Sequence, residues 1–159
     1  MKKNRLLSER KQPNLVCLCI DRNQDGEIGG KIYNRYSRAP ELFDNVVQMI
    51  RSLENFYNRI SFPQSSMELR GFAKEEAACG GEEESPRSLS GEEELLERRG
   101  EYATFLVAVR FRQNATWQGD LYWVEKRQEK KFKSVLELLI LIDNILFTKE
   151  KENRLREKW

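Results

Sequence analysis

Basic and aromatic side chains are interleaved in the last third of this 159-residue sequence. The set that could form one binding face comprises Arg110, Arg112, Trp117, Tyr122, Trp123, Lys131 and Lys133. Cationic side chains bind phosphates and aromatic rings stack on bases, so this composition is one way to hold single-stranded nucleic acid. The same strand faces and edges can instead meet a partner protein, and no RNP-like motif favours the nucleic acid.

Oxygen-bearing side chains are also grouped near the N-terminus. Asp21, Asn23 and Asp25, followed by Gly26, match the positions that begin an EF-hand calcium loop. The twelfth position of such a loop should be glutamate, and here it is Ile32. A hairpin turn favours Asp, Asn and Gly equally well. We therefore predict a turn, no metal and no cofactor, with a metal site at these three residues as the alternative.

The residue types that most often carry catalysis are scarce. The chain has no histidine, which removes the commonest general base and the commonest zinc ligand. Its three cysteines are an odd number, as expected for free thiols in a reducing compartment. Cys17 and Cys19 are two apart in an apolar run, so on a strand they share one face as small buried hydrophobes. We predict that the protein is not an enzyme.

Two similar series of elements could position these residues. Apolar alternation and turn residues predict strands at 14–20, 27–36 and 38–43, followed by an amphipathic helix at 45–60. A second series has strands at 102–112, 116–125 and 130–133 and a helix at 135–147. Each helix begins with a capping box, Asn45 with Gln48 and Ser134 with Glu137.

The two series align without a gap. Sliding the sequence by 89 residues places 15–57 on 104–146, with seven identical pairs that include Gly30 on Gly119 and Tyr33 on Tyr122. The strands, the turn, the edge and the cap fall in one register, which chance would rarely produce. We therefore predict an α+β fold made by tandem duplication of a β-β-β-α module, with antiparallel sheets and the two helices packed together.

The distribution of charged residues separates the same two series of elements from an acidic segment between them. We predict a first module at 14–62, an acidic and largely disordered linker at 63–101, and a second module at 102–150. Residues 1–13 and 151–159 are charged termini, and a helical turn is expected at 92–99. The linker either shields the basic modules or acts as a solvating spacer.

The second helix is apolar nearly all round, so it must be covered on more than one side. Its own sheet covers one side. For the other side we expect the first helix, which would make a monomer with a pseudo-twofold core, and a homodimer is the alternative.

The sequence resembles a family of small bacterial proteins of the Firmicutes type. The resemblance rests on FRQNATWQG at 111–119, FKSVLEL at 132–138 and GKIYNRY at 30–36. No activity is assigned to that family, so the resemblance implies a bacterial origin and a cytoplasmic setting.

The expected function is a non-catalytic protein-interaction or regulatory module with an unknown protein partner. The alternative is a nucleic-acid-binding regulator that uses the basic, aromatic sheet of the second module. We expect a cytoplasmic protein without a membrane partner, because no apolar run follows the basic start and the longest run, 138–142, is far shorter than the roughly 18 residues that span a bilayer.

Overall fold

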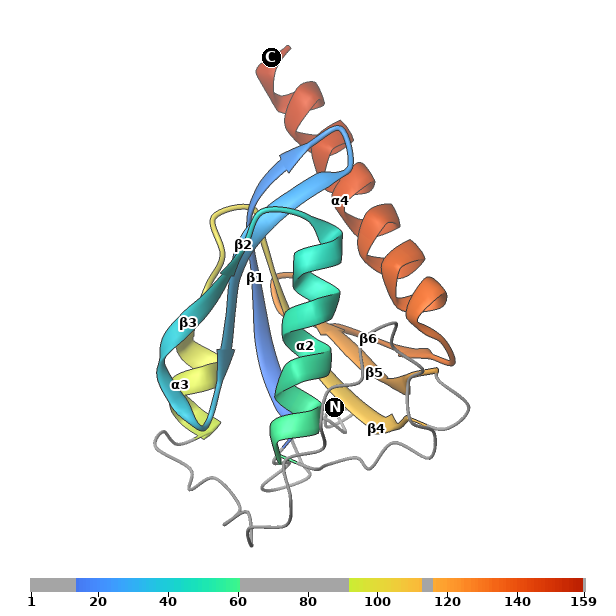
Figure 1. Cartoon of the computed structure of the whole chain (residues 1–159). Helices are drawn as coiled ribbons and strands as arrows, with labels where there is room; N and C mark the ends of the chain where they lie inside the picture. Colours follow the sequence, from blue (N-terminus) through green and yellow to red (C-terminus); the bar gives the residue numbers. More distant parts are fainter. Residues whose placement is uncertain (1–13, 61–91, 113–115, 159) are drawn as a thin grey trace, which may run out of the picture.

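A computed structural model describes residues 14–60, 92–112 and 116–158 (Figure 1). The strands are β1 (Leu15–Gln24), β2 (Glu27–Asn34), β3 (Ser37–Phe43), β4 (Ala103–Phe111), β5 (Gln118–Trp123) and β6 (Gln128–Phe132). The helices are α2 (Val46–Ile60), α3 (Glu92–Glu97) and α4 (Val135–Glu157). Each predicted strand and both predicted long helices occur, so the α+β class is confirmed. The charged tail forms the last turns of α4. Residues 113–115, between the predicted strands 102–112 and 116–125, lie outside the described residues.

All six strands form one antiparallel sheet in the order β3-β2-β1-β4-β5-β6. We had expected separate sheets, and that prediction was wrong because β1 and β4 pair with each other. Both strands are apolar on both faces, which is typical of central strands. Pairing them satisfies the backbone groups that two separate sheets would each leave at an edge.

The strand register repeats with the 89-residue spacing. Gly30 lies opposite Ile20 in the first half, and the corresponding Gly119 lies opposite Val109 in the second. A register shift follows both pairs. At the centre of the sheet Cys17 pairs with Leu106, which is its own counterpart at that spacing. An approximate twofold axis therefore passes between these two residues.

Both glycines are required by a close backbone approach. A Cβ on Gly30 would lie 1.9 Å from the carbonyl oxygen of Cys19. A Cβ on Gly119 would lie 2.0 Å from the carbonyl oxygen of Ala108, the counterpart of Cys19. Real Cβ atoms essentially never approach an atom so closely. The glycine identity between the two halves therefore has a direct steric cause.

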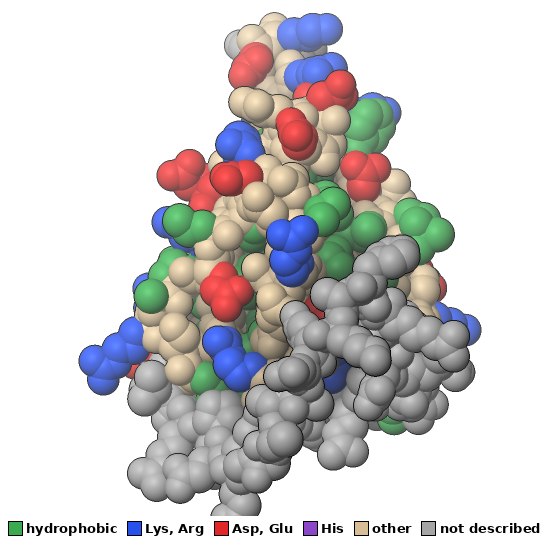
Figure 2. All heavy atoms as spheres, in the orientation of Figure 1, with side chains coloured by type: hydrophobic (Ala, Val, Ile, Leu, Met, Phe, Trp, Pro, Cys, Tyr) green, Lys and Arg blue, Asp and Glu red, His purple; other side chains and the backbone are tan. Residues whose placement is uncertain are grey.

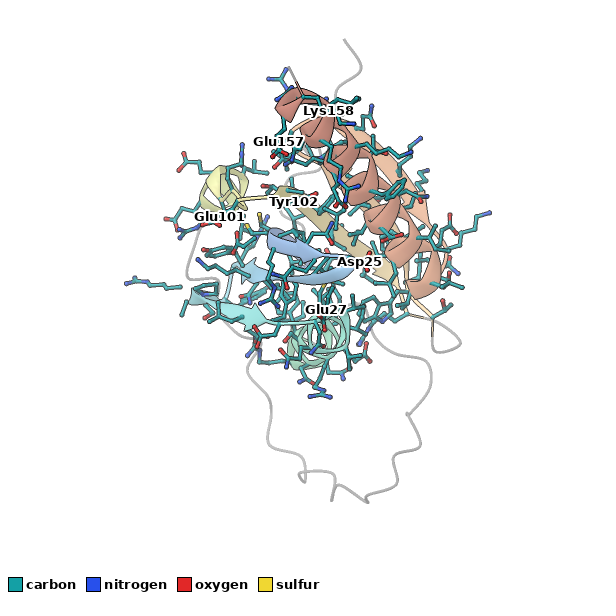
Figure 3. All side chains as sticks on the ribbon, turned by 90° about the horizontal axis from the view of Figure 1, so that it is seen from above. Asp25, Glu27, Glu101, Tyr102, Glu157 and Lys158 are labelled. Atoms are coloured by element: carbon teal, nitrogen blue, oxygen red, sulfur yellow. The ribbon has the colours of Figure 1, made fainter. Side chains whose placement is uncertain are left out.

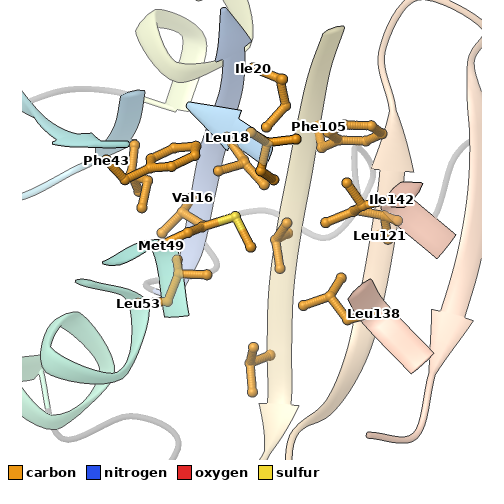
Figure 4. Packing of buried hydrophobic residues seen from close by; sticks show 14 of the residues in the cluster. Val16, Leu18, Ile20, Phe43, Met49, Leu53, Phe105, Leu121, Leu138 and Ile142 are labelled. Carbon is orange, nitrogen blue, oxygen red and sulfur yellow. The ribbon is translucent and has the colours of Figure 1, made fainter. Parts of the chain in front are cut away.

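The main core lies between one face of the sheet and the two long helices. Figure 4 shows Met49 and Leu53 of α2 and Leu138 and Ile142 of α4 pointing at side chains from the central strands. Both helices therefore contribute to one continuous apolar cluster. The first helix does not cover the outer side of α4, where Leu136 remains exposed. The expected helix–helix seam is thus replaced by a sheet that both helices share.

The opposite face of the sheet is covered at its centre by α3. Leu95 of α3 is buried with Cys17, Cys19, Leu106 and Tyr122. The helical turn expected within 92–99 is therefore present and packed. The remainder of the predicted linker, residues 63–91, lies outside the described residues.

The helix caps have the same geometry in both halves. Asn45 Oδ1 accepts a hydrogen bond from the Gln48 amide at 2.9 Å, and Ser134 Oγ accepts one from the Glu137 amide at 3.0 Å. The side chain of Gln48 or Glu137 accepts in turn from the amide one residue before the cap. The predicted capping boxes are confirmed, with the return bond shifted by one residue.

We expect Ser134→Ala to lower the free energy of unfolding by about 1 kcal/mol, because the Glu137 amide loses its acceptor. Urea denaturation monitored by circular dichroism measures this loss. Ser134→Asn retains a capping oxygen and should stay close to the wild type. Equal losses for Ala and Asn would contradict the capping role.

Candidate functional site

The seven candidate residues do not form one surface. Arg112, Trp117 and Trp123 lie on the helix-covered side of the sheet, where they contact α2 or line the space beside α4. Tyr122 lies on the opposite side, under α3. The remaining three members, Arg110, Lys131 and Lys133, belong to β4, to β6 and to the residue after β6.

The three aromatic side chains of this set are buried. Trp117, Tyr122 and Trp123 have exposed fractions of 5%, 4% and 6%. Base stacking needs an accessible ring face. The aromatic rings of the described candidate residues therefore offer no stacking platform for nucleic acid. The basic residues of the set are not accompanied by an accessible aromatic ring from the same set.

The basic residues of the set differ in their surroundings. Arg110 forms an ion pair with the buried carboxylate of Asp120, and Lys131 lies opposite Asp120 in the sheet. Lys131 and Lys133 are exposed. Arg110 therefore neutralises a buried carboxylate, which gives it a structural role whatever else the surface does.

Glu54 of α2 links the first helix to the second half. Trp117 Nε1 donates a hydrogen bond to Glu54 Oε2 at 3.0 Å. A nitrogen of the Arg112 guanidinium donates to Glu54 Oε1 at 3.2 Å and to Asn58 Oδ1 at 2.8 Å. The Arg112 side chain is only 4% exposed and lies 5.8 Å from the ring centre of Tyr57. Two candidate binding residues are therefore structural anchors.

The loop considered for calcium is a tight hairpin. Asp25 and Gly26 form its two-residue turn with φ values of 53° and 86°, as a type I′ turn requires. Asn23 Oδ1 accepts a hydrogen bond from the Gly26 amide, and Asp21 Oδ1 accepts one from the Glu101 amide. Within the described ranges no group of three or more His, Cys, Asp or Glu residues could hold a metal ion.

Cys17 and Cys19 are buried together on the α3 side of the sheet, with their sulfur atoms 3.8 Å apart. Their mutual hydrogen bond, followed by burial, raises the pKa of the Cys17 thiol, which keeps it protonated. A protonated thiol is a poor nucleophile and a poor metal ligand. The placement agrees with the expectation of small buried hydrophobes.

The outer side of α4 carries an apolar stripe that consists of Leu136, Ile140 and Phe147. Their exposed fractions are 66%, 50% and 55%. Residues four apart on a helix are neighbours on one face, so Leu136 and Ile140 are adjacent, and Phe147 lies on the same face two turns further on, beyond Asp143 and Asn144. Figure 2 shows hydrophobic side chains interrupting the charged surface along α4. Two of the three counterparts in α2 are polar, Arg51 and Asn58.

A groove of about 410 Å³ lies beside the stripe, between α4 and the tip of the β1–β2 hairpin. Phe147 and Asp143 line it from the helix, and Asn23 and Asp25 line it from the hairpin. Figure 3 shows Asp25 at the hairpin tip, next to α4. Glu150, Lys151 and Arg154 also line the groove, and Arg154 pairs with Glu150 at 2.8 Å. The groove therefore combines an aromatic ring with the cation of Lys151 and with the carboxylates of Asp25 and Asp143, which have no ion-pair partner among the described residues.

The equivalent position, beside α2 and the β4–β5 hairpin, is filled. There Trp117 lies between the helix and the neighbouring hairpin and donates to Glu54. The counterparts of Glu54 and Trp117 are Asp143 and Ile28. The Asp143 carboxylate of α4 therefore lies at an open groove, whereas the Glu54 carboxylate of α2 accepts a hydrogen bond from the buried Trp117 indole. The groove at Asp143 was not predicted from the sequence, because the hydrogen bond between Trp117 and Glu54 that reveals it joins residues far apart in the chain.

Comparisons with protein-family models, curated proteins and solved structures found no match. The resemblance to small bacterial proteins therefore remains a prediction. None of the helices that the structure describes is long and apolar enough to cross a membrane.

Proposed function

We propose that this chain is a non-catalytic interaction protein that docks a partner protein on the outer side of α4. The observation that carries the proposal is the exposed stripe of Leu136, Ile140 and Phe147. Large apolar side chains grouped on a surface commonly mark an interaction site. The absence of histidine and the use of Arg112 and Trp117 as structural anchors also support a role other than catalysis.

The partner should provide an apolar helix or strand with one donor group. Its apolar face would cover the stripe, which extends over about 16 Å from residue 136 to residue 147 at 1.5 Å per residue. A basic or indole side chain of the partner would enter the groove and donate to Asp143 of α4, as Trp117 of the second half donates to Glu54 of α2.

A second copy of the chain fits this surface poorly. An antiparallel pairing that places Ile140 on Phe147 of the second copy has its twofold axis between residues 143 and 144. The two Asp143 carboxylates would then approach each other, and like charges repel. A different protein with a cation at that point avoids the repulsion, so we favour a heterologous partner over a homodimer.

We also propose that the fold arose by tandem duplication of a β-β-β-α module and that the protein is cytoplasmic. The repeated register, the two glycine contacts and the two matching caps support the duplication. After the duplication the two halves would have diverged: Trp117 fills the groove beside α2, Ile28 stands at its counterpart position beside α4, and α4 gained an apolar outer stripe.

The test exchanges the stripe for the residues of the first helix. We expect the double variant Ile140→Arg, Phe147→Asn to lose a stoichiometric protein partner that the wild type retains during affinity purification. Val47→Arg is the matched control, because Val47 is 66% exposed on α2 and corresponds to Leu136. Since all three positions are exposed, the free energy of unfolding should change by no more than about 0.5 kcal/mol.

Each result has a distinct meaning. Loss of the partner from the stripe variant alone, with and without nuclease, supports the proposal, and titration of the purified partner should show at least tenfold weaker binding to that variant. A partner that disappears after nuclease treatment would favour the nucleic-acid function. Sedimentation of the wild type as a dimer and of the variant as a monomer would favour self-association.

A further inference from the structure

A second cavity, of about 460 Å³, lies between β5, β6 and the flank of α4 that faces them. Leu121, Leu141 and Ile145 form its apolar wall, Trp123 also lines it, and Lys126 and Lys130 lie along it. Sites that bind small molecules typically have volumes of this order and an apolar lining with a few polar groups. The apolar residues that α4 contributes, Leu141 and Ile145, lie on a different flank of the helix from Leu136, Ile140 and Phe147, so this site differs from the proposed docking surface.

The indole of Trp123 has a buried donor. The side chain is 6% exposed, and its Nε1 atom has no hydrogen-bond partner among the described residues. A buried donor without an acceptor is destabilising, so such groups are rare unless something else satisfies them. Nε1 has almost no accessible surface, so an acceptor atom of a bound molecule would remove this destabilisation once the indole turns toward the cavity that Trp123 lines.

The first half shows what fits the corresponding space. There the ring of Tyr36 packs against Phe56 of α2, with ring centres 6.0 Å apart. The counterpart of Phe56 is the smaller Ile145, and the counterpart of Tyr36 is Glu125. Glu125 is exposed and accepts a hydrogen bond from the amide of Thr104. The second half therefore has a cavity where the first half has a phenol ring.

The charge along the cavity also differs between the halves. In the first half Glu41 lies 3.9 Å from Arg59, which balances the charge. Their counterparts are Lys130 and Thr148, which leave a positive charge in the second half. Lys126 adds a further cation, 3.8 Å from the partly exposed Glu152. Glu152 also lines the cavity and offsets the charge of Lys126, so Lys130 provides the surplus positive charge, which favours an anionic group.

We propose that the cavity between β5, β6 and α4 binds a small molecule with one aromatic ring and a carboxylate. The ring occupies the apolar wall in the way that Tyr36 does in the first half. The carboxylate lies near Lys126 and Lys130, and an oxygen of the ligand accepts from Trp123 Nε1.

The test uses 4-hydroxyphenylacetate and heteronuclear NMR of the full chain. We expect a saturable shift of the Trp123 indole N–H signal, which is assigned by its loss in Trp123→Phe. Ile145→Phe copies the first half, fills the cavity and should weaken binding about tenfold or more. Lys130→Glu copies Glu41 and should weaken binding about fivefold.

Two controls separate the site from nonspecific binding. Lys131→Glu makes the same charge change on the adjacent residue of β6, which faces the other side of the sheet, and should leave the affinity unchanged. The neutral alcohol 2-(4-hydroxyphenyl)ethanol should bind wild type and Lys130→Glu equally. The dispersion of the same spectra shows whether each variant folds. Absence of a saturable shift at millimolar probe, or equal affinities for wild type, Ile145→Phe and Lys130→Glu, would overturn the proposal.

Discussion

Gly119→Ala is expected to lower the free energy of unfolding by about 3–5 kcal/mol, the range of the most damaging single substitutions. The new Cβ would lie 2.0 Å from the carbonyl oxygen of Ala108, a backbone atom that cannot move without breaking the β4–β5 ladder. Gly30→Ala should have a similar effect, because its Cβ would meet the carbonyl oxygen of Cys19. Urea denaturation of both variants measures the loss.

Gly26→Ala is the matched control for these substitutions. Gly26 has a φ of 86° but no atom within 4 Å of an added Cβ, so the cost is limited to backbone strain of about 1–2 kcal/mol. If Gly119→Ala cost no more than Gly26→Ala, the close strand approach at the register shift would be incorrect.

Arg112→Met is expected to lower the free energy of unfolding by about 2–3 kcal/mol. Among the described residues, the substitution leaves the Glu54 carboxylate with only the Trp117 indole as its partner, beside the packed side of α2. Removing one partner of a fully buried ion pair costs about 3–5 kcal/mol, and the partial exposure of Glu54 reduces that range. Chemical denaturation provides the measurement.

Glu54→Gln in the Arg112→Met background should recover part of the loss, because it removes the unpaired charge. The coupling free energy of this double-mutant cycle should therefore be clearly different from zero. Arg154→Met is the matched control, since Arg154 pairs with Glu150 on the exposed end of α4 and should contribute less than about 0.5 kcal/mol. Equal effects of the two arginine substitutions would mean that Arg112 is not an anchor.

Local and periodic signals predicted most of the elements. The Asp25–Gly26 turn, the glycine in the second strand and the two caps are determined by residues close in sequence, and each occurs in the structure. The 89-residue spacing also anticipated which residues correspond across the twofold axis. By contrast, β1 was expected to end at residue 20 and continues to Gln24, because the hairpin extends beyond the core as a polar ribbon.

Long-range contacts could not be predicted in the same way. Glu54 receives Trp117 and Arg112 from strands that lie far along the chain, and no local pattern marks that pairing. Without it, a tryptophan and an arginine near other basic residues resembled a binding face. The joining of two modules through β1 and β4 was missed for a related reason, since apolar strands indicate burial but not their neighbours.

Comparison of the two halves explains where the candidate sites lie. Trp117 fills the groove beside α2, and the corresponding groove beside α4, at Asp143, is open. Tyr36 occupies a space whose counterpart is the cavity lined by Trp123. The exposed stripe on α4 likewise differs from the polar outer side of α2. Both proposals therefore rest on positions where the two halves differ.

Site-specific photo-crosslinking tests the docking proposal most directly. A benzophenone amino acid replaces Ile140 on the outer side of α4 or, in the matched variant, its counterpart Arg51 on α2. We expect one discrete protein adduct, resistant to nuclease, from position 140 and none from position 51. Equal adducts from both positions, or a nucleic-acid adduct alone, would contradict docking on the outer side of α4.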